Sequence, residues 1–308
     1  MVNNPLLFST QPYQYLGDKI GAAVDLEAGI VEVRNFPDGE RYQRIVTTVS
    51  ERNVVLLGGT HSDAATLELY DLACSMVKHG AASLTLMVPY FAYSTMERSV
   101  RSGEVVTAKA RARLLSSIPT AAKSNRIVLM DLHAAGITYY FEGNVVPLQL
   151  YAKPVILETC RRWGGEQFVL ASTDAGRAKW VESLANELGV DAAFVFKRRI
   201  DGRKTELRAM SASVKGSTVI IYDDMIRTGG SLLNAARAYL DAGAARICAI
   251  ATHGVLPEDA LQRLMASNLF EQIAVTDTHP RTQAIAHPQV EVLSVSGIFA
   301  DWIQTHII

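Results

Sequence analysis

The 308-residue chain has few cysteines, almost no net charge and no long apolar run. Its three cysteines, Cys74, Cys160 and Cys248, match neither a metal-ligand spacing nor a disulfide framework, so we expect a reducing compartment and a cytoplasmic protein. Because 30 basic residues face 31 acidic ones, a nucleic-acid partner is not expected. No apolar run approaches the roughly 18 to 20 residues of a membrane helix. The first residues also lack the pattern of a signal peptide, so we expect no membrane partner.

The composition and the pattern of apolar residues favour a folded α/β protein. Apolar residues make up 49% of the chain, which is enough to exclude disorder, and the length suits two domains of about 150 residues. Short apolar runs predict strands near 5–8, 30–34, 53–57, 84–88, 126–130, 145–148, 167–171, 192–196, 217–222, 246–251, 271–275 and 290–293. Helical periodicity predicts helices at 13–23, 62–79, 106–117, 153–162, 175–188, 230–241, 258–266 and 297–306. This alternation is typical of parallel sheets covered by helices.

The chain predicts a boundary between two α/β halves near 148–154. There LQLYAKP connects a strand to a helix with Pro154 in its first turn, which gives domains 1–150 and 151–308. The segment 198–216 shows no clear periodicity, so we expect a long loop, and such loops often act as lids.

The strongest motif is TVIIYDDMIRTGGSLLNAA at 218–236. An apolar strand is predicted to end in two carboxylates, Asp223 and Asp224, before a turn and an amphipathic helix. Ligands of parallel sheets bind outside the carboxyl ends of the strands, and a glycine turn at a helix N-terminus suits a phosphate. The two acids suit sugar hydroxyls or a hydrated divalent ion. The plain alternative is a strand-to-helix turn with solvated acids.

This motif closely resembles the phosphoribosyl-diphosphate (PRPP) binding motif of the phosphoribosyltransferase fold. Further segments, in order, resemble the ribose-phosphate diphosphokinase (PRPP synthetase) family: NFPDGE at 35–40, VPYFAYSTMERSVRSGE at 88–104, DLHA at 131–134, FKRR at 196–199, ATHGVL at 251–256 and SVSGIFADWI at 294–303. The resemblance covers nearly the whole chain. It implies an α/β fold of two similar phosphoribosyltransferase-like domains, each a mostly parallel sheet flanked by helices.

The resemblance also implies an activity: transfer of the β,γ-diphosphoryl group of ATP to the anomeric hydroxyl of ribose 5-phosphate, which gives PRPP and AMP. It implies Mg²⁺ as cofactor, ATP and ribose 5-phosphate as partners, and a homo-oligomer, a dimer or hexamer. The domain 1–150 is then the ATP-binding one, and 151–308 carries the ribose-phosphate loop and a catalytic flexible loop.

Residue by residue, the resemblance implies the following roles. The catalytic pair is Lys197 and Arg199, in a stretch, 197–208, that holds six basic and two acidic residues. ATP is bound by Phe36, Asp38, Glu40, Arg98 and His133. The metal-associated residues are His133 and Asp174. The ribose phosphate is bound by Asp223, Asp224, Arg227, Thr228, Gly229, Gly230 and Ser231.

Each of these segments has a structural alternative. NFPDGE is also the composition of an ordinary turn, and the charged stretches around Arg98 and Lys197 are also typical of solvated loops. His133 is alternatively a structural histidine, and Asp174 alternatively caps a helix.

The chain departs from the common family pattern in three places. Thr95-Met96 stands where many members have Arg-Gln, Arg227 stands where an acid is usual, and the sequence after Arg199 differs. TMER and YYFEGNV (139–145) look more like the plant-type branch, which is noted for relaxed donor choice. Three alternatives therefore stay open: diphosphoryl transfer to another ribosyl phosphate, a phosphoribosyltransferase, and a non-catalytic regulatory homologue.

Overall fold

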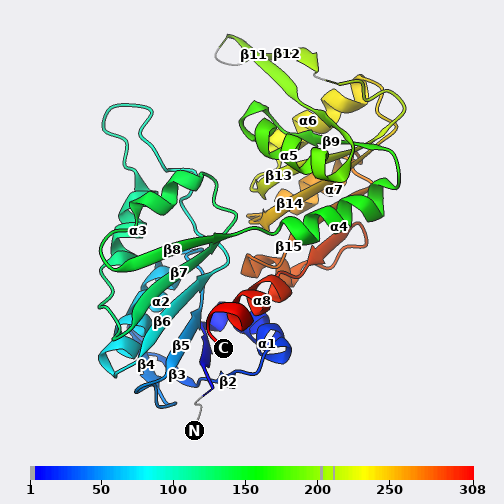
Figure 1. The fold of residues 1–308 in the computed structure, drawn as a ribbon. Coiled ribbons are helices and arrows are strands. Elements are labelled where there is room, and N and C mark those ends of the chain that lie inside the picture. The colour runs from blue at the N-terminus through cyan, green and yellow to red at the C-terminus, as the bar shows by residue number, and fades with distance from the viewer. Residues whose placement is uncertain (1–3, 202–203, 211) are drawn as a thin grey trace. The chain divides into compact units, whose positions relative to one another are not determined.

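The computed structural model describes residues 4–201, 204–210 and 212–308. The chain divides into two compact units (Figure 1). Unit 1 comprises Met1–Tyr151 and Val295–Ile308, and unit 2 comprises Ala152–Ser294.

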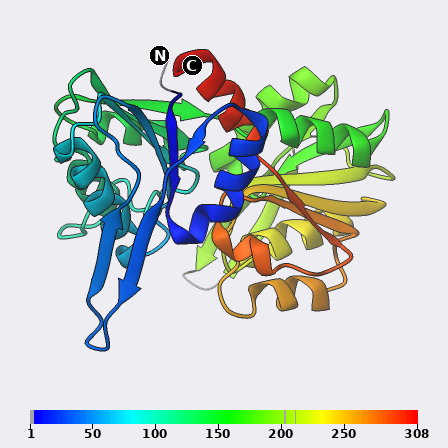
Figure 2. The same ribbon diagram turned by 90° about the horizontal axis from the view of Figure 1, so that it is seen from below.

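Unit 1 is built on a parallel sheet of six strands in the order β2-β1-β5-β6-β7-β8. The strands are β1 (Leu6–Ser9), β2 (Glu27–Ala28), β5 (Asn53–Leu57), β6 (Ser83–Val88), β7 (Ser124–Met130) and β8 (Val145–Leu150). A separate antiparallel hairpin is formed by β3 (Val31–Asn35) and β4 (Arg41–Ile45). The helices are η1 (Gln11–Tyr13), α1 (Gln14–Ala23), α2 (Asp63–Lys78), α3 (Thr107–Ser116), η2 (Ala135–Tyr140) and α8 (Ser296–His306). Figure 2 shows α1 and α8 on one face of the sheet and α2 on the other.

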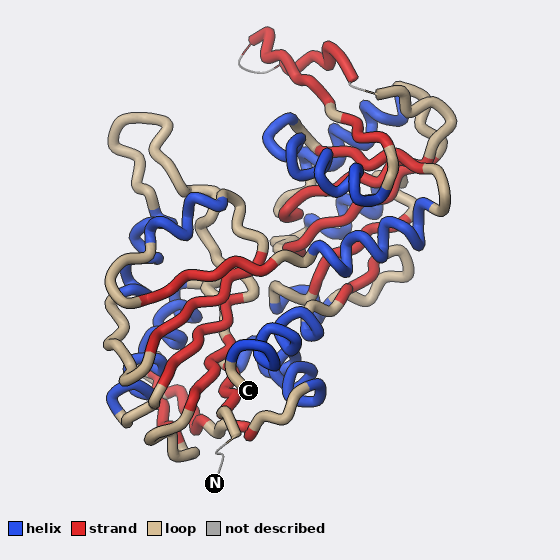
Figure 3. Tube along the Cα trace, viewed as in Figure 1, coloured by secondary structure: helices blue, strands red, loops and turns tan. Residues whose placement is uncertain are grey.

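Unit 2 repeats this plan with a parallel sheet in the order β10-β9-β13-β14-β15-β16. The strands are β9 (Phe168–Ser172), β10 (Asp191–Ala193), β13 (Thr218–Ile226), β14 (Arg246–Gly254), β15 (Gln272–Thr276) and β16 (Val290–Leu293). Its antiparallel hairpin is formed by β11 (Val195–Asp201) and β12 (Lys204–Met210), and Figure 3 shows this hairpin standing away from the sheet. The helices are α4 (Lys153–Gly164), η3 (Ala175–Arg177), α5 (Ala178–Leu188), α6 (Gly230–Asp241), α7 (Ala260–Ala266) and η4 (Pro280–Ala284).

The two units therefore share one element order, with the hairpin inserted at the same point between the second and third strands of the main sheet. The helix that follows the last strand of each unit packs in the other unit. Helix α4 follows β8 of unit 1 but packs on α5 in unit 2, and α8 follows β16 of unit 2 but packs on α1 in unit 1. The predicted α/β fold with two similar, mostly parallel sheets is confirmed.

The local sequence accounts for the well-predicted elements. Four consecutive residues of β13, from Val219 to Tyr222, are at most 1% exposed, because a parallel strand covered by helices on both faces is apolar throughout. Helix α2 begins where Ser62 Oγ accepts a hydrogen bond from the backbone N–H of Ala65, and it ends before Gly80, whose φ is +88°.

The structure differs from the predictions in several places. The expected long loop at 198–216 was wrong, because most of it forms the β11–β12 hairpin. The strands β2, β4 and β12 were not predicted, and the strand expected at 192–196 is split between β10 and β11. The segment 295–308 lies in unit 1, whereas the predicted second domain, 151–308, included it. Among the described residues, no helix combines the length and apolar character that a membrane span requires.

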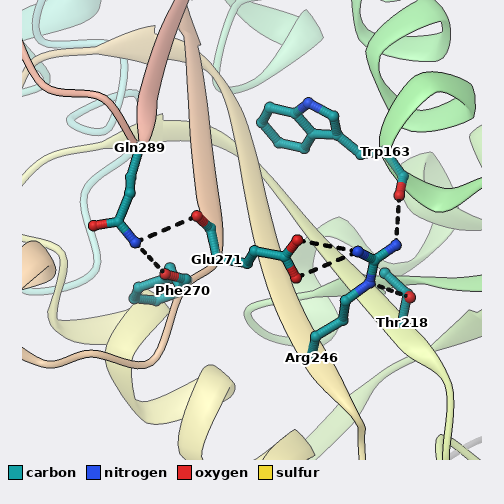
Figure 4. A network of polar contacts seen from close by, with 6 residues as sticks. All are labelled: Trp163, Thr218, Arg246, Phe270, Glu271 and Gln289. Carbon is teal, nitrogen blue, oxygen red and sulfur yellow. Dashed lines mark hydrogen bonds and ion pairs between the residues drawn. The ribbon is translucent and has the colours of Figure 1, made fainter.

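The amino ends of the unit 2 strands are fastened by Arg246, the first residue of β14 (Figure 4). Its guanidinium donates to the Thr218 hydroxyl at the start of β13 (2.7 Å), to the Trp163 carbonyl in α4 (2.9 Å) and to the Glu271 carboxylate before β15 (3.0 Å). Gln289 in turn donates to the backbone carbonyl of Phe270 (3.2 Å). These contacts lie at the edge opposite to the carboxyl ends, so they hold the sheet without occupying the edge that carries ligands.

We expect Arg246→Ala to lower the free energy of unfolding by about 1–2 kcal/mol, because it removes hydrogen bonds and a half-exposed ion pair at once. Chemical denaturation checks this. The control is Arg237→Ala, on an exposed position of α6, for which we expect a change of at most about 0.5 kcal/mol. Equal effects of the two substitutions would show that the Arg246 contacts contribute nothing specific.

Candidate functional site

The acids of the strongest motif lie inside a strand. The β13 ladder continues past the predicted end at Tyr222, with Asp223 paired to Ala251 and Ile226 paired to Gly254. The extension of β13 depends on its pairing with β14. The sequence did not indicate it because β14 also runs beyond its predicted end at 251. Asp223 and Asp224 are therefore the sixth and seventh of the nine residues of β13, where the backbone is held by the sheet.

The two carboxyls have different partners. The Thr173 hydroxyl donates to Asp223 Oδ2 (2.9 Å), and the backbone N–H of Asp224 donates to Asp223 Oδ1 (2.9 Å). Asp224, which is 4% exposed, forms an ion pair with the guanidinium of Arg177. Burial raises the pKa of Asp223 to about 7, and the adjacent Asp224 carboxyl adds to the rise. The site thus holds one carboxyl, Asp223, whose pKa is close to neutral pH, and one, Asp224, that is paired with a cation.

Thr173 and Arg177 are site residues that the sequence reading missed. Both lie in the turn after β9, and β9 is the hydrogen-bonded neighbour of β13, with Ser172 opposite Tyr222. The turn was recognised through Asp174 alone. The signal in the sequence was the positive charge of Arg177 shortly after a predicted strand. Only the strand order, in which β9 pairs with β13, places that charge beside Asp224.

The turn from Arg227 to Ser231 connects β13 to α6. Gly229 adopts a left-handed backbone (φ +78°), and a Cβ there would lie 2.9 Å from the side chain of Leu264, so this position requires glycine twice over. Arg227, Thr228, Gly230 and Ser231 are exposed at the N-terminus of α6. Exposed N–H groups and hydroxyls at the start of a 12-residue helix suit a phosphate group.

Asp174 caps its own turn. Its Oδ1 accepts from the backbone N–H of Gly176 (2.8 Å), and its carbonyl accepts from the Ser172 hydroxyl (2.6 Å). The capping alternative is therefore present in the structure. The side chain is also exposed, so capping and metal binding are compatible.

The predicted catalytic pair lies on the β11–β12 hairpin. In the backbone register, Lys197 is opposite Leu207 and Arg199 is opposite Thr205. The side chains of this hairpin lie outside the described part of the structure, so the roles of Lys197 and Arg199 remain predictions.

In unit 1 the segment NFPDGE forms the tip of the β3–β4 hairpin. The backbone N–H of Phe36 donates to the Glu40 carbonyl (2.8 Å), Gly39 has φ +92°, and Asp38 Oδ1 accepts from the N–H of Glu40 (3.0 Å). The ordinary-turn alternative thus describes the local backbone. Phe36 is nonetheless 48% exposed, and an exposed aromatic ring on a hydrogen-bonded turn is suited to stacking on a base.

The loop after β6 carries Arg98 and is fixed at its base. The Tyr93 hydroxyl donates to Asp63 Oδ1 (2.9 Å), Arg111 donates to the same oxygen (2.6 Å), and the Arg111 guanidinium lies 5.2 Å from the centre of the Tyr93 ring. At the tip, the Glu104 carboxylate accepts from the N–H groups of Val100 (2.7 Å) and Arg101. These two hydrogen bonds lower the pKa of Glu104.

The side chain of Arg98 is 78% exposed, 3.3 Å from the Glu97 carboxylate. An exposed guanidinium on a loop held at both ends is suited to a phosphate oxygen.

His133 follows the end of β7 in a partly exposed position. The preceding acid Asp131 is buried and has a positive φ of 40°, which is unusual for a residue other than glycine. Backbone strain of this kind is concentrated at binding and catalytic sites, which favours the functional over the structural interpretation of DLHA.

Asp223 generates a pH prediction. The folded chain keeps this proton up to about pH 7, whereas an unfolded aspartate loses it near pH 4, so its contribution to stability is lost as the pH rises through that range. Without divalent cations, we expect the stability of Asp223→Asn relative to wild type to rise by roughly 2–3 kcal/mol from pH 5 to pH 8.

Denaturant titration at both pH values measures this difference. Asp241→Asn, at the exposed end of α6, is the control and should show no such rise. If the two variants had parallel pH profiles, Asp223 would not carry the linked proton.

Comparison with known proteins places this geometry in a family. The model of the N-terminal domain of ribose phosphate pyrophosphokinase matches residues 6–118, and that of the phosphoribosyl synthetase-associated domain matches 173–307. The ribose-phosphate pyrophosphokinases of Fusobacterium nucleatum and Rhodopirellula baltica are 32% and 33% identical, covering 97% of this chain and 94% of each relative. The crystal structure of phosphoribosylpyrophosphate synthetase from Mycobacterium smegmatis superposes with a TM-score of 0.86 at 28% identity, covering 98% of both chains. The chain belongs to the ribose-phosphate pyrophosphokinase family.

Proposed function

We propose that the protein transfers the β,γ-diphosphoryl group of ATP to the anomeric hydroxyl of ribose 5-phosphate, giving PRPP and AMP. The anomeric oxygen attacks the β-phosphorus while the bond from that phosphorus to the α-phosphate oxygen breaks, and the hydroxyl proton is released. The observation that carries the proposal is the edge of unit 2, where two carboxyls, a glycine turn and a helix N-terminus follow one strand. These groups match the two ends of a ribosyl phosphate.

In this arrangement Asp223 and Asp224 accept hydrogen bonds from ribose hydroxyls, and the turn from Arg227 to Ser231 holds the 5-phosphate. The second role rests on exposed backbone N–H groups and hydroxyls at the start of α6. Both roles need only local geometry of unit 2.

The ATP-binding roles belong to unit 1. Phe36 stacks on the adenine, Asp38 and Glu40 accept from its polar edge, and Arg98 binds phosphate oxygens. The support is the exposure of Phe36 and Arg98 on segments held by hydrogen bonds. A homo-oligomer, a dimer or hexamer, belongs to the same proposal. In the family that the sequence resembles, the loop that corresponds to NFPDGE often binds adenine across a subunit interface.

Mg²⁺ fits the donor set in part. The exposed carboxylate of Asp174 is the oxygen ligand that Mg²⁺ prefers, and His133 is the second candidate. Among the described residues there is no group of three His, Cys, Asp or Glu that would hold a metal alone. Such a group is not required, because Mg²⁺ is commonly held by one or two carboxylates together with substrate phosphates and water. When bound, it neutralises charge on the transferred phosphates.

The direct test is incubation with ATP, Mg²⁺ and ribose 5-phosphate, with chromatography for AMP and PRPP. We expect the two products in equal amounts. Because Arg227 stands in the phosphate-binding turn, ribosyl phosphates with a further phosphate group are tested in parallel. Absence of AMP with every acceptor would exclude diphosphoryl transfer and favour a regulatory homologue.

Lys197 and Arg199 are proposed to stabilise the negative charge that develops on the transferred group. We therefore expect Lys197→Ala to lower kcat on the order of 100-fold while the Kd for ATP changes little. Single-turnover kinetics and equilibrium nucleotide binding separate the two quantities. The control is Lys215→Ala, at an exposed position between β12 and β13. A loss of ATP affinity with unchanged turnover at saturation would assign Lys197 to nucleotide binding instead.

A further inference from the structure

The acid pair on β13 has a cation of its own. Arg177 ends η3, the turn after β9, and its guanidinium forms an ion pair with Asp224 Oδ2. The two side chains are 19% and 5% exposed, so solvent screens their attraction only weakly. Arginine stays protonated throughout the accessible pH range, which makes this a permanent positive charge.

The pair needs such a charge. When both are ionised, the two neighbouring carboxyls repel each other, and burial of Asp224 without a counter-charge is costly. Asp223 is held by neutral donors, the Thr173 hydroxyl and the backbone N–H of Asp224. Asp224 is the member that lies deeper and carries the ion pair.

A divalent cation is the usual alternative counter-ion for an acid pair, and here it would compete with a side chain. The guanidinium already occupies Asp224 Oδ2, and a metal ion at that oxygen would be brought against a fixed positive charge. The residues around Asp224 therefore do not fit a metal ion, whereas the exposed Asp174 does.

We propose that Arg177 is the resident counter-ion of the Asp223–Asp224 pair, so that the pair receives the hydroxyls of a ribosyl phosphate without a divalent cation on its own carboxylates. The ligand in this statement rests on the proposed function, but the counter-ion role does not. The three groups then carry a formal charge of −1 when both acids are ionised, instead of −2, which weakens repulsion of a phosphorylated sugar. Arg177 is in this sense a specificity-determining residue, because it decides whether acceptor binding depends on metal.

Metal binding tests the counter-ion role directly. Mn²⁺ is titrated into nucleotide-free protein and counted by electron paramagnetic resonance. We expect Arg177→Met, which removes the charge and keeps much of the volume, to bind one more Mn²⁺ than wild type. The matched variants Arg177→Lys and Arg177→Met/Asp224→Asn should bind the same number as wild type, because one keeps the charge and the other removes the ligand.

The single variant Asp224→Asn provides an answer even if Arg177→Met does not fold. If wild type carries no Mn²⁺ on the pair, this substitution leaves the number of bound ions unchanged. A decrease would overturn the proposal, and so would a folded Arg177→Met variant that gains no ion. Thermal unfolding of each variant identifies those that are folded.

Ribose 5-phosphate binding, measured by calorimetry in EDTA and in Mg²⁺, tests the consequence for the ligand. We expect the wild-type Kd to be about the same in both, and that of Arg177→Met to be about tenfold weaker in EDTA and restored by Mg²⁺. Wild-type binding that requires Mg²⁺ would overturn the proposal. If wild type binds no ribosyl phosphate while the Mn²⁺ difference is found, the proposed function fails and the counter-ion role stands.

Discussion

The site in unit 2 depends on one electrostatic constraint. Asp224, which is buried, and Asp223, which is partly buried, are neighbours on β13, so their charge must be compensated locally. The parallel pairing of β9 with β13 supplies the compensation, because it brings the turn after β9, with Thr173 and Arg177, to the end of β13 that carries the acids. The same pairing continues to β14, which keeps the backbone of the acids inside the sheet. The glycine turn and α6 then follow directly from the sheet, with Gly229 in a left-handed conformation at a position where a Cβ would lie 2.9 Å from the Leu264 side chain.

Repetition of one topology in both units separates the substrate tasks by position. In each unit the chain forms a separate antiparallel hairpin at the same point between strands of the main sheet, β3–β4 in unit 1 and β11–β12 in unit 2. The first hairpin carries the predicted adenine-binding tip and the second carries the predicted catalytic pair. Parallel strands joined by helices leave little freedom at the sheet itself, so a projecting hairpin is a place where new side chains are added without disturbing the core. The exchange of α4 and α8 also reflects helix packing. Helix α4 packs beside α5 in unit 2, and α8 packs beside α1 in unit 1.

The parts of this fold that sequence predicts are those set by local pattern. Helix α2 is visible from its apolar face and its cap at Ser62, and β13 from an unbroken apolar run. The β11–β12 hairpin was missed because half of its strand residues are charged and no alternation of apolar and polar residues is present, so the strands are recognised by their pairing. Membership of 295–308 in unit 1 depends on tertiary packing against α1. The contact of Arg177 with Asp224 requires the strand order, which skips from β9 to β13 and joins residues far apart in the chain.

The family membership supports the reaction, whereas the proposed choice of acceptor rests on residues in which this chain differs from the family pattern or which the motif omits. Arg177 and Arg227 both lie near the proposed acceptor site, and their environments differ. Arg177 is largely buried and forms an ion pair with Asp224, so its charge is compensated inside the protein. Arg227 is exposed on the turn that precedes α6, so its charge is accessible to solvent. In the proposed arrangement, the internal cation affects how the sugar hydroxyls are bound, and the exposed one affects how many phosphate groups the acceptor can carry. The proposal therefore divides acceptor choice into a diol component on β13 and a phosphate component on the turn, which correspond to the two parts of a ribosyl phosphate.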